Sequence, residues 1–227
     1  MSRIHFIGGE KGGVGKSVVA RLLAQFFIDR NVPLAGIDGD GSNATLLRHY
    51  GDFSQLADLG MTESADQILD RALGAERRVL VDLPAQSARS LGSWLAGANV
   101  LGLARELGIP ITFWHVTDGG FASVAQLERT LDAYGGQAEH VVVRNFGRAK
   151  DFSQLEASAA LRKLGELSGK TLDLPALDDS VMFKIDSSGL SFWAAAQGDT
   201  LKPLEKERVK LWLNKAYAQL EALGEAI

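Results

Sequence analysis

Residues 11–17, Lys-Gly-Gly-Val-Gly-Lys-Ser, have the composition of a loop that wraps around a polyphosphate. Glycines accept positive φ angles and carry no side chain, so backbone N–H groups can approach phosphate oxygens closely. A helix beginning near Lys16 would add its N-terminal N–H groups and its dipole. In this arrangement Lys16 contacts the β and γ phosphates and the Ser17 hydroxyl binds Mg²⁺. The segment therefore predicts binding and hydrolysis of a nucleoside triphosphate, for which ATP is the first choice. The residues expected to contact it are Gly12, Gly13, Val14, Gly15, Lys16, Ser17 and Val18.

The loop departs from the usual pattern G-x-x-x-x-G-K-[ST] at its first position. Glu10 stands where a glycine is expected, and a second lysine, Lys11, follows it. A glycine-rich turn that happens to carry lysines is the alternative. The apolar run before the loop, the helical pattern after it and the carboxylates described below favour the phosphate loop.

Lys-Gly-Gly-Val-Gly-Lys-Ser resembles the deviant Walker A motif of the ParA/MinD family of P-loop ATPases, whose marker is the extra lysine. The resemblance implies an ATP-dependent sandwich dimer. In it, Lys11 would reach the nucleotide of the partner subunit and neutralise charge that develops during phosphoryl transfer. Glu10 is compatible with the resemblance, since this position varies in the ParA branch.

Two carboxylates follow the second predicted strand in the segment Asp38-Gly39-Asp40-Gly41-Ser42-Asn43. Residues i and i+2 at a strand end point to the same side, so both carboxylates can face the phosphates. The segment is similar to the family's Asp-x-Asp switch. We therefore expect Asp40 to position or polarise the attacking water and Asp38 to belong to the magnesium shell. An Asp/Gly/Asn turn is the alternative that the same composition favours.

A third carboxylate, Asp82, ends the apolar run Val79-Leu80-Val81. This pattern predicts a Walker B strand whose aspartate holds Mg²⁺ through water, because Mg²⁺ keeps much of its hydration shell. Asp82-Leu83-Pro84-Ala85 also resembles the family's Asp-x-Pro-x switch. A strand-ending aspartate that caps a helix is the alternative.

Recognition of the base is predicted at two other strand ends. Asn145 follows the apolar run 141–143, at the place where relatives often carry a base-reading asparagine. Pro175 follows the last predicted strand and corresponds to a loop that lines the adenine. For Asn145 a turn residue is an equally good interpretation.

Apolar runs alternate with helical stretches along the chain. Strands are predicted at 4–7, 34–37, 78–83, 109–116, 140–145 and 171–174. Helices are predicted at 17–30, 62–73, 88–107 with a break near 97, 122–134, 153–167 and 203–223. This alternation is typical of an α/β fold with a mostly parallel, twisted sheet and helices on both faces. Such sheets bind ligands at the carboxyl ends of their strands, where the loop and the three aspartates are expected.

The composition narrows the classes of protein. The 227 residues fit one domain, 1–227, and contain no cysteine. This excludes disulfides, Cys-ligated zinc and the iron–sulfur proteins of the same superfamily. The four histidines are dispersed without metal-ligand spacing. No apolar run reaches the ~18 residues of a membrane span and no signal peptide is evident, so we expect a cytoplasmic protein.

Binding to DNA or membrane would need a local surface patch, because the net charge is −4. Residues 219–227, at the end of the last predicted helix, contain two glutamates and no lysine, which favours docking on the domain over membrane anchoring. ParA-like proteins bind DNA without sequence specificity through Lys and Arg, although a solvated helix face explains such residues equally well. The candidates for weak, ATP-dependent DNA binding are Arg144, Arg148, Lys150, Arg162, Lys163, Lys184, Lys202, Lys206, Arg208 and Lys210.

The leading functional hypothesis is an ATPase that switches between a monomer and an ATP-bound homodimer. A partner protein would stimulate its slow hydrolysis and so position a plasmid, chromosome or protein cargo. One alternative is a metabolic enzyme of the same fold, such as an ATP-dependent amidoligase or synthetase. These enzymes generally lack the marker lysine. Another is a nucleotide-gated adaptor in conjugation or secretion, whose active site would look the same.

Overall fold

Seven parallel strands form one sheet in the computed structural model, which describes residues 1–9 and 11–227. Glu10, at the atypical first position of the loop, lies outside the described residues. The strand order is β3-β2-β4-β1-β5-β6-β7, and every pairing is parallel. The strands are β1 (Arg3–Gly8), β2 (Leu34–Asp38), β3 (Ser54–Leu56), β4 (Arg78–Asp82), β5 (Ile111–Thr117), β6 (Glu139–Asn145) and β7 (Lys170–Leu174). The predicted α/β fold with a parallel sheet is confirmed.

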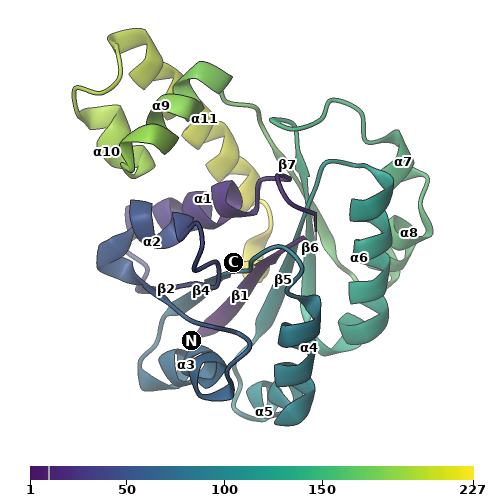
Figure 1. The fold of residues 1–227 in the computed structure, drawn as a ribbon. Helices are drawn as coiled ribbons and strands as arrows, with labels where there is room; N and C mark the ends of the chain where they lie inside the picture. The colour runs from purple at the N-terminus through teal and green to yellow at the C-terminus, as the bar shows by residue number, and fades with distance from the viewer. Residues whose placement is uncertain (10) are drawn as a thin grey trace.

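Helices connect the strands and cover both faces of the sheet (Figure 1). They are α1 (Lys16–Asp29), α2 (Thr45–His49), α3 (Thr62–Gly74), α4 (Ala88–Gly97), α5 (Val100–Glu106), α6 (Phe121–Tyr134), α7 (Ser153–Glu156), α8 (Ala159–Glu166), α9 (Asp179–Ser188), α10 (Phe192–Gln197) and α11 (Pro203–Glu221). The predicted break near Gly97 separates α4 from α5. The single helix predicted at 153–167 is wrong: the chain interrupts it at Ser158, whose hydroxyl accepts a hydrogen bond from Leu161 N and caps a new helix, α8.

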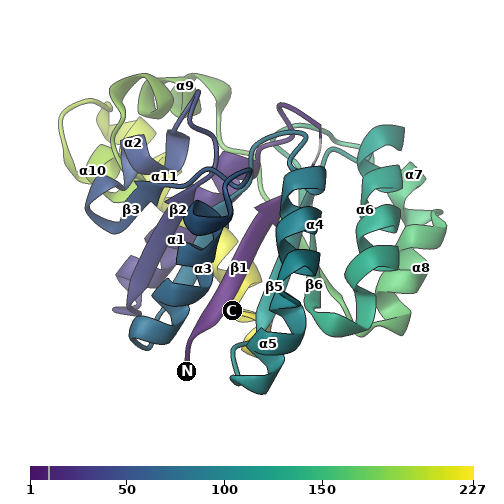
Figure 2. The same ribbon diagram turned by 60° about the horizontal axis from the view of Figure 1, so that its bottom comes forward.

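Alternate residues of the strands point to opposite faces, as the period of a β-strand requires. On β1, Phe6 packs with the cluster under α3, α4 and α5, while Ile7 packs with the cluster under α1, α10 and α11. On β5, Phe113 and Trp114 divide in the same way. Figure 2 shows α3, α4, α6 and α8 side by side in front of the sheet and α11 behind it.

Two regions contain elements that the sequence did not predict. Residues 45–56 form α2, a 3-10 turn and β3, and residues 179–197 form α9 and α10. These elements are short, so neither propensity nor periodicity distinguishes them from loops. One local signal was present: the Asp178 carboxylate accepts hydrogen bonds from the N–H groups of Ser180 and Val181 and caps α9.

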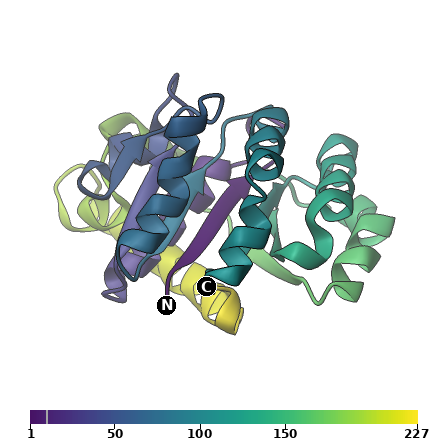
Figure 3. The ribbon, with the colours of Figure 1, turned by 90° about the horizontal axis from the view of Figure 1, so that it is seen from below.

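The terminal helix α11 is docked on the sheet, as predicted. Val209, Trp212, Ala216 and Leu220 belong to the buried cluster that includes α1 and strands β5 to β7. Among the described residues, no helix is both long and apolar enough to cross a membrane. Figure 3 shows that both ends of the chain lie at the same edge of the sheet, opposite the edge where β1, β2 and β4 end.

The register of the sheet brings the predicted site residues together. Ile7 on β1 pairs with Asp82 on β4, and Asp82 pairs with Asp38 on β2. Because the three strands are parallel neighbours, the loop after β1 and the two aspartates meet at one edge of the sheet.

Candidate functional site

The loop after β1 takes a conformation that glycine permits. Gly13 and Gly15 have φ angles of 80° and 103°, in the region that other residues rarely adopt. A side chain at Gly15 would also collide with Asn145, whose Nδ2 lies 2.3 Å from the position of an added Cβ. Directly after Gly15, α1 begins, and the Gly15 carbonyl accepts hydrogen bonds from the N–H groups of Val18 and Val19.

A cavity of about 330 Å³ opens over this loop, and we name it the phosphate cavity. Six of the seven loop residues predicted to contact the phosphates line it, and the seventh, Val14, is buried. Lys16 is only 8% exposed, and its Nζ lies 3.3 Å from the Lys11 carbonyl oxygen. The lining consists of Gly12, Gly13, Gly15, Lys16, Ser17, Val18, Arg21, Asp40, Asn43, Thr45, Arg48, Leu83, Ala85, Arg148 and Asp186.

Asp82 lies near Ser17, Lys16 and Arg21, which line this cavity, and its carboxylate has no hydrogen-bond partner among the described residues. The residue is 1% exposed. The pKa of Asp82 is raised to about 7, mainly by burial and also by the neighbouring Asp38, although Ser17, Lys16 and Arg21 lower it. The Ser17 hydroxyl lies close enough to the carboxylate to affect its pKa without forming a hydrogen bond of normal geometry. A buried carboxylate in this condition favours a bound cation, which would restore its ionised form.

The residues present fit a magnesium ion. The bare Asp82 carboxylate and the Ser17 hydroxyl are oxygen ligands of the type that Mg²⁺ prefers. No group of three or more His, Cys, Asp or Glu residues that could hold a metal occurs among the described residues. Phosphate oxygens and water would therefore complete the coordination shell, as is usual for Mg²⁺ in nucleotide sites.

Asp38 is in a different condition from Asp82. It is fully buried, but its Oδ1 accepts a hydrogen bond from Asp40 N at 3.0 Å and its Oδ2 accepts one from Leu47 N at 3.1 Å. Burial raises the pKa of Asp38, and these backbone N–H groups oppose the shift. Its carboxylate thus fastens residues 40–47 to the sheet. The magnesium role of Asp38 stays a prediction, and Asp82 is the better candidate because its carboxylate oxygens, unlike those of Asp38, lack hydrogen-bond partners among the described residues.

Asp40 faces the phosphate cavity at the start of the turn that leads into α2. Its carboxylate accepts hydrogen bonds from the N–H groups of Ser42 and Asn43 and, at 2.8 Å, from the Asn43 side chain. The Asn43 side chain is the main cause of a lowered pKa of Asp40, and Lys16 contributes. An ionised Asp40 at the cavity wall is suited to orient a water molecule, and this role also stays a prediction.

Lys11 lies outside the phosphate cavity. Its ammonium group forms an ion pair with the carboxylate of Asp118, which follows β5. Asp118 also accepts hydrogen bonds from Ser123 Oγ at 2.7 Å and from Gly120 N at 3.2 Å. Partial burial works against ionisation of Asp118, but Lys11, Ser123 and Gly120 together lower its pKa. The Lys11 side chain remains 47% exposed.

Asn145 connects the loop to the neighbouring part of the site. Its Nδ2 donates to the Val14 carbonyl at 2.8 Å, and its Oδ1 accepts from Gly147 N at 3.0 Å. The residue therefore braces the phosphate loop, and its contact with a base stays a prediction. Pro175 lies nearby, and its carbonyl accepts a hydrogen bond from Trp212 Nε1 at 2.7 Å.

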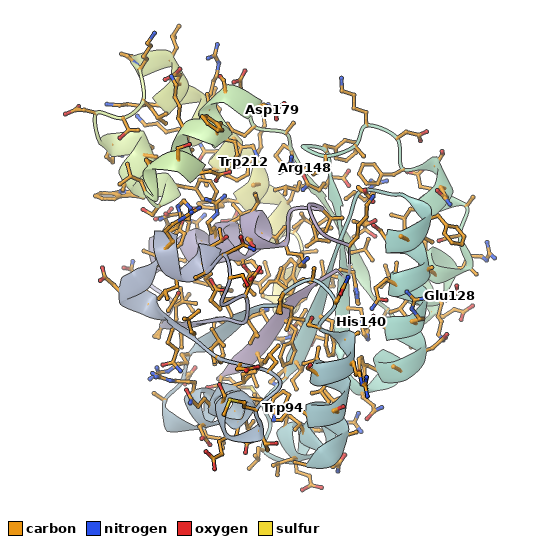
Figure 4. The ribbon with its side chains drawn as sticks, viewed as in Figure 1. Trp94, Glu128, His140, Arg148, Asp179 and Trp212 are labelled. Carbon is orange, nitrogen blue, oxygen red and sulfur yellow. The ribbon has the colours of Figure 1, made fainter. Side chains whose placement is uncertain are left out.

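Asn145 and Pro175 line a second cavity of about 350 Å³, which we name the base cavity. It shares Val18, Arg148 and Asp186 with the phosphate cavity, so the two adjoin. In Figure 4, Arg148 lies on the side of the molecule where Asp179 on α9 and Trp212 on α11 face the loop after β6. The remaining lining residues are Gly147, Leu174, Leu177, Met182 and Phe183, together with Asn145, Pro175, Asp179 and Trp212.

Among the residues of the site that the sequence did not predict are Asp118, Arg21 and Arg148. Asp118 had a usable signal, since an aspartate and two glycines follow an apolar strand there, and aspartates end the strands at Asp38 and Asp82 too. Arg21 is four residues after Ser17 on α1 and thus on the same helix face. Arg148 was considered only as a DNA contact, although it lines both cavities.

Several other candidates for DNA binding are engaged in ion pairs. Arg144 pairs with Asp173 and Glu156. The three paired lysines are Lys163 with Asp132, Lys184 with Glu205 and Lys206 with Asp199. These pairs reduce the positive charge that the surface offers to phosphate groups.

Solved structures of similar shape define the class of fold. The septum site-determining protein MinD of Pyrococcus horikoshii OT3, complexed with Mg-ADP, matches with a TM-score of 0.58 at 16% identity, covering 100% of this chain and 99% of MinD. A ParA family ATPase from Chlorobium tepidum TLS matches with a TM-score of 0.55 at 16% identity, covering 93% and 98%. The chain has the ParA/MinD-like fold of P-loop nucleotide-binding proteins, as the resemblance implied.

The proteins that are similar to this chain in sequence are named TraL and MobD. The chain is 27% identical to Protein TraL of Escherichia coli over 247 residues of alignment, covering 97% of this chain and 98% of TraL. It is 26% identical to Protein MobD of Acidithiobacillus ferrooxidans over 226 residues, covering 97% of each. No protein-family model matches the chain.

Proposed function

We propose that the protein is a magnesium-dependent ATPase that switches between a monomer and an ATP-bound homodimer. The observation that carries this proposal is the position of Lys11. Its side chain does not line the phosphate cavity of its own chain, and it is held by Asp118 at the rim of the site. Such a lysine is available to a nucleotide on a second copy, as the resemblance to ParA/MinD proteins implies.

The residues of one chain have distinct tasks in this proposal. Lys16 and the N–H groups of residues 12–17 hold the β and γ phosphates, and Asp82 and Ser17 hold Mg²⁺. The ion would neutralise charge on the phosphates. Asp40 orients the attacking water and receives its proton. Lys11 of the other copy would then stabilise the charge that develops on the transferred phosphoryl group.

Light scattering with ADP and then with ATP tests the proposal. The protein should be a monomer with ADP and a dimer with ATP. Asp40→Asn keeps an oxygen for the hydrogen bonds from the backbone N–H groups of Ser42 and Asn43 and loses only the acceptor for the Asn43 side chain. It should therefore trap the ATP-bound dimer with little turnover. Lys11→Ala should lose turnover and dimerise poorly. A monomer in both nucleotides, or unchanged hydrolysis in Lys11→Ala, would favour a metabolic enzyme of the same fold.

Two cellular roles fit such a switch. The first, positioning of a plasmid, chromosome or protein cargo, is supported by the fold shared with ParA and MinD proteins. The second is that of a nucleotide-gated adaptor in conjugation or secretion. It is supported by TraL and MobD, which are similar to the chain in sequence along nearly their whole length, at 27% and 26% identity. Pull-down of the ATP-locked Asp40→Asn protein, with its host's transfer proteins as prey, distinguishes an adaptor from a partition protein.

Non-specific DNA binding by the ATP-bound dimer belongs to the positioning role. Two weak sites held together in a dimer would bind DNA with avidity that the monomer lacks. Gel-shift measurements at low salt with the Asp40→Asn protein test this, and absence of binding to plasmid DNA would remove DNA from the proposal. Stimulation of hydrolysis by a partner protein is part of the same proposal.

A further inference from the structure

A third cavity, of about 460 Å³, lies away from the nucleotide site between α1, α2 and α10. These helices gather on the left side of the molecule in Figure 1 and again in Figure 2. We name it the aromatic pocket, after the rings of Tyr50, Phe53 and Trp193 in its wall. Phe53 and Trp193 are large apolar side chains that remain exposed, Trp193 by 58%.

The floor of the aromatic pocket is a buried hydrogen-bond network. Gln25 Oε1 accepts hydrogen bonds from the Tyr50 hydroxyl and from Trp193 N, both at 3.0 Å. The Tyr50 hydroxyl in turn accepts one from Phe192 N at 3.2 Å. Gln25 and Tyr50 are buried. A satisfied network of this kind holds the pocket open in one shape.

The charge of the aromatic pocket is negative. Asp29 and Asp52 line it, and none of the described lysines and arginines does so. The remaining titratable side chain of the wall besides Tyr50 is His49, which is neutral, because burial and the nearby Arg21 lower its pKa to about 4. Exposed aromatic rings beside two carboxylates attract a cationic side chain through both cation–π contact and charge.

The aromatic pocket is joined to the phosphate cavity by two side chains. Arg21, which lines the phosphate cavity, donates from Nη1 to His49 Nε2 at 3.0 Å. His49 lines the aromatic pocket and donates from Nδ1 to the Leu190 carbonyl at 2.7 Å. Arg21 also forms an ion pair at 2.8 Å with Asp186, which lies in the wall of both nucleotide cavities. Movement of α2 or α10 around an occupant would therefore displace Arg21.

We propose that the aromatic pocket receives an arginine or lysine side chain from a partner protein, and that its occupancy changes nucleotide affinity through His49 and Arg21. The coupling rests on the proposed nucleotide switch. The binding itself does not, because it can be measured on the protein without nucleotide. The two claims can therefore fail separately.

Binding is tested with a fluorescein-labelled hexa-arginine peptide, followed by anisotropy, and with hexa-citrulline as the neutral peptide of similar shape. The wild-type protein should bind hexa-arginine at least about tenfold more tightly than hexa-citrulline. Asp52→Asn and Trp193→Ala should each weaken binding by about 3- to 5-fold. Asp70→Asn on α3 changes the net charge by the same amount away from the pocket and should leave binding unchanged.

Equal weakening by Asp52→Asn and Asp70→Asn would mean general attraction by net charge and would overturn the pocket. The proposed pocket would also be overturned if neither Asp52→Asn nor Trp193→Ala altered the binding of hexa-arginine. The fluorescence of Trp193 gives an independent check, since Trp94, Trp114 and Trp212 are buried. Saturation with hexa-arginine should change tryptophan emission in the wild type and leave it unchanged in Trp193→Phe.

Coupling is tested by measuring the Kd of ADP with and without saturating hexa-arginine. The peptide should change the Kd by about 5-fold, and ADP should change the Kd of the peptide by the same factor, because coupling between two sites is reciprocal. His49→Gln should bring both factors close to one. A wild-type factor of one would overturn the coupling, even where the peptide binds.

Discussion

Lys16 and Lys11 belong to the same loop, yet the two sides of the loop have opposite surroundings. Lys16 is buried in the wall of the phosphate cavity, close to Asp82 and Asp40. Lys11 projects to the rim, where Asp118 holds it and solvent reaches it. On the inner side the Asp82 carboxylate lacks a hydrogen-bond partner among the described residues, while the outer side is already neutralised within the chain.

This difference indicates which parts of the site a single chain can complete. A cation and a nucleotide would stabilise the inner side directly, because they would satisfy the buried Asp82 carboxylate. On the outer side, Lys11 and Asp118 neutralise each other, so no unpaired charge remains there to be stabilised until the nucleotide of a second copy approaches. We therefore expect the inner side to bind the cation and nucleotide of its own chain, and Lys11 on the outer side to act on the nucleotide of another copy.

The largest effect should come from the inner side. Lys16→Ala removes a cation from a partly dehydrated phosphate site, so ATP affinity should fall about 100-fold. The ratio kcat/KM should fall by about 1000-fold. Calorimetry with ATP and a steady-state ATPase assay measure both. Lys215→Ala, which removes an exposed lysine on α11, is the control, and a similar loss in that variant would refute a specific role for Lys16.

The next effect concerns the stability of the protein with EDTA and no nucleotide. The pKa of Asp82 is raised from 3.8 to about 7, so the folded state holds a proton there that the unfolded state has lost. Stability should therefore fall as pH rises from about 4 to about 7 and change little above. Asp82→Asn should remove this slope.

Urea unfolding at pH 5 and pH 8 measures the effect. The free energy of unfolding of the Asp82→Asn variant minus that of the wild type should be larger at pH 8 than at pH 5, by roughly 2–3 kcal/mol. The buried histidines act in the opposite direction, since a lowered pKa makes stability fall as pH drops below 6.5, but they are common to both proteins. If the free energies of unfolding of wild type and variant differed by the same amount at both pH values, the raised pKa of a buried Asp82 carboxyl would be contradicted.

The smallest effect should come from the outer side. Asp118→Asn keeps an acceptor for Ser123 and Gly120 but releases Lys11. ATP-dependent dimerisation should then strengthen by about 2- to 5-fold, the range expected for one exposed ion pair. Sedimentation equilibrium measures it, and Asp132→Asn, which breaks the pair with Lys163, is the control. Weaker dimerisation would mean that Asp118 contributes to the interface itself.

The inner side could be predicted from the sequence because its parts are local. The loop, the strand-end aspartates and the helix that begins at Lys16 each have a pattern within a few residues. The parallel sheet then brings Asp38 and Asp82 together. The state of each carboxylate could not be predicted, since the hydrogen bonds of Asp38 depend on α2, a helix of five residues with no clear pattern.

The base cavity was predicted only in part for a similar reason. Asn145 and Pro175 lie at strand ends and were found, but Asp179, Met182 and Phe183 belong to α9. The position of α9 is set by packing against α1 and α11, which involves residues far apart in the chain. The pairing of Lys11 with Asp118 spans 107 positions and has no local pattern either.

The most direct test of the account is to mix two inactive proteins, Lys11→Ala and Asp40→Asn, in the presence of ATP. A mixed dimer has one site with its own Asp40 and a lysine from the other copy. If Lys11 acts on the partner, mixing should restore hydrolysis. Random pairing would give about a quarter of the wild-type rate, since half of the dimers are mixed and half of their sites are complete, and the weaker dimerisation of Lys11→Ala lowers this value. If Lys11 acts within its own chain, the mixture should stay as inactive as its components.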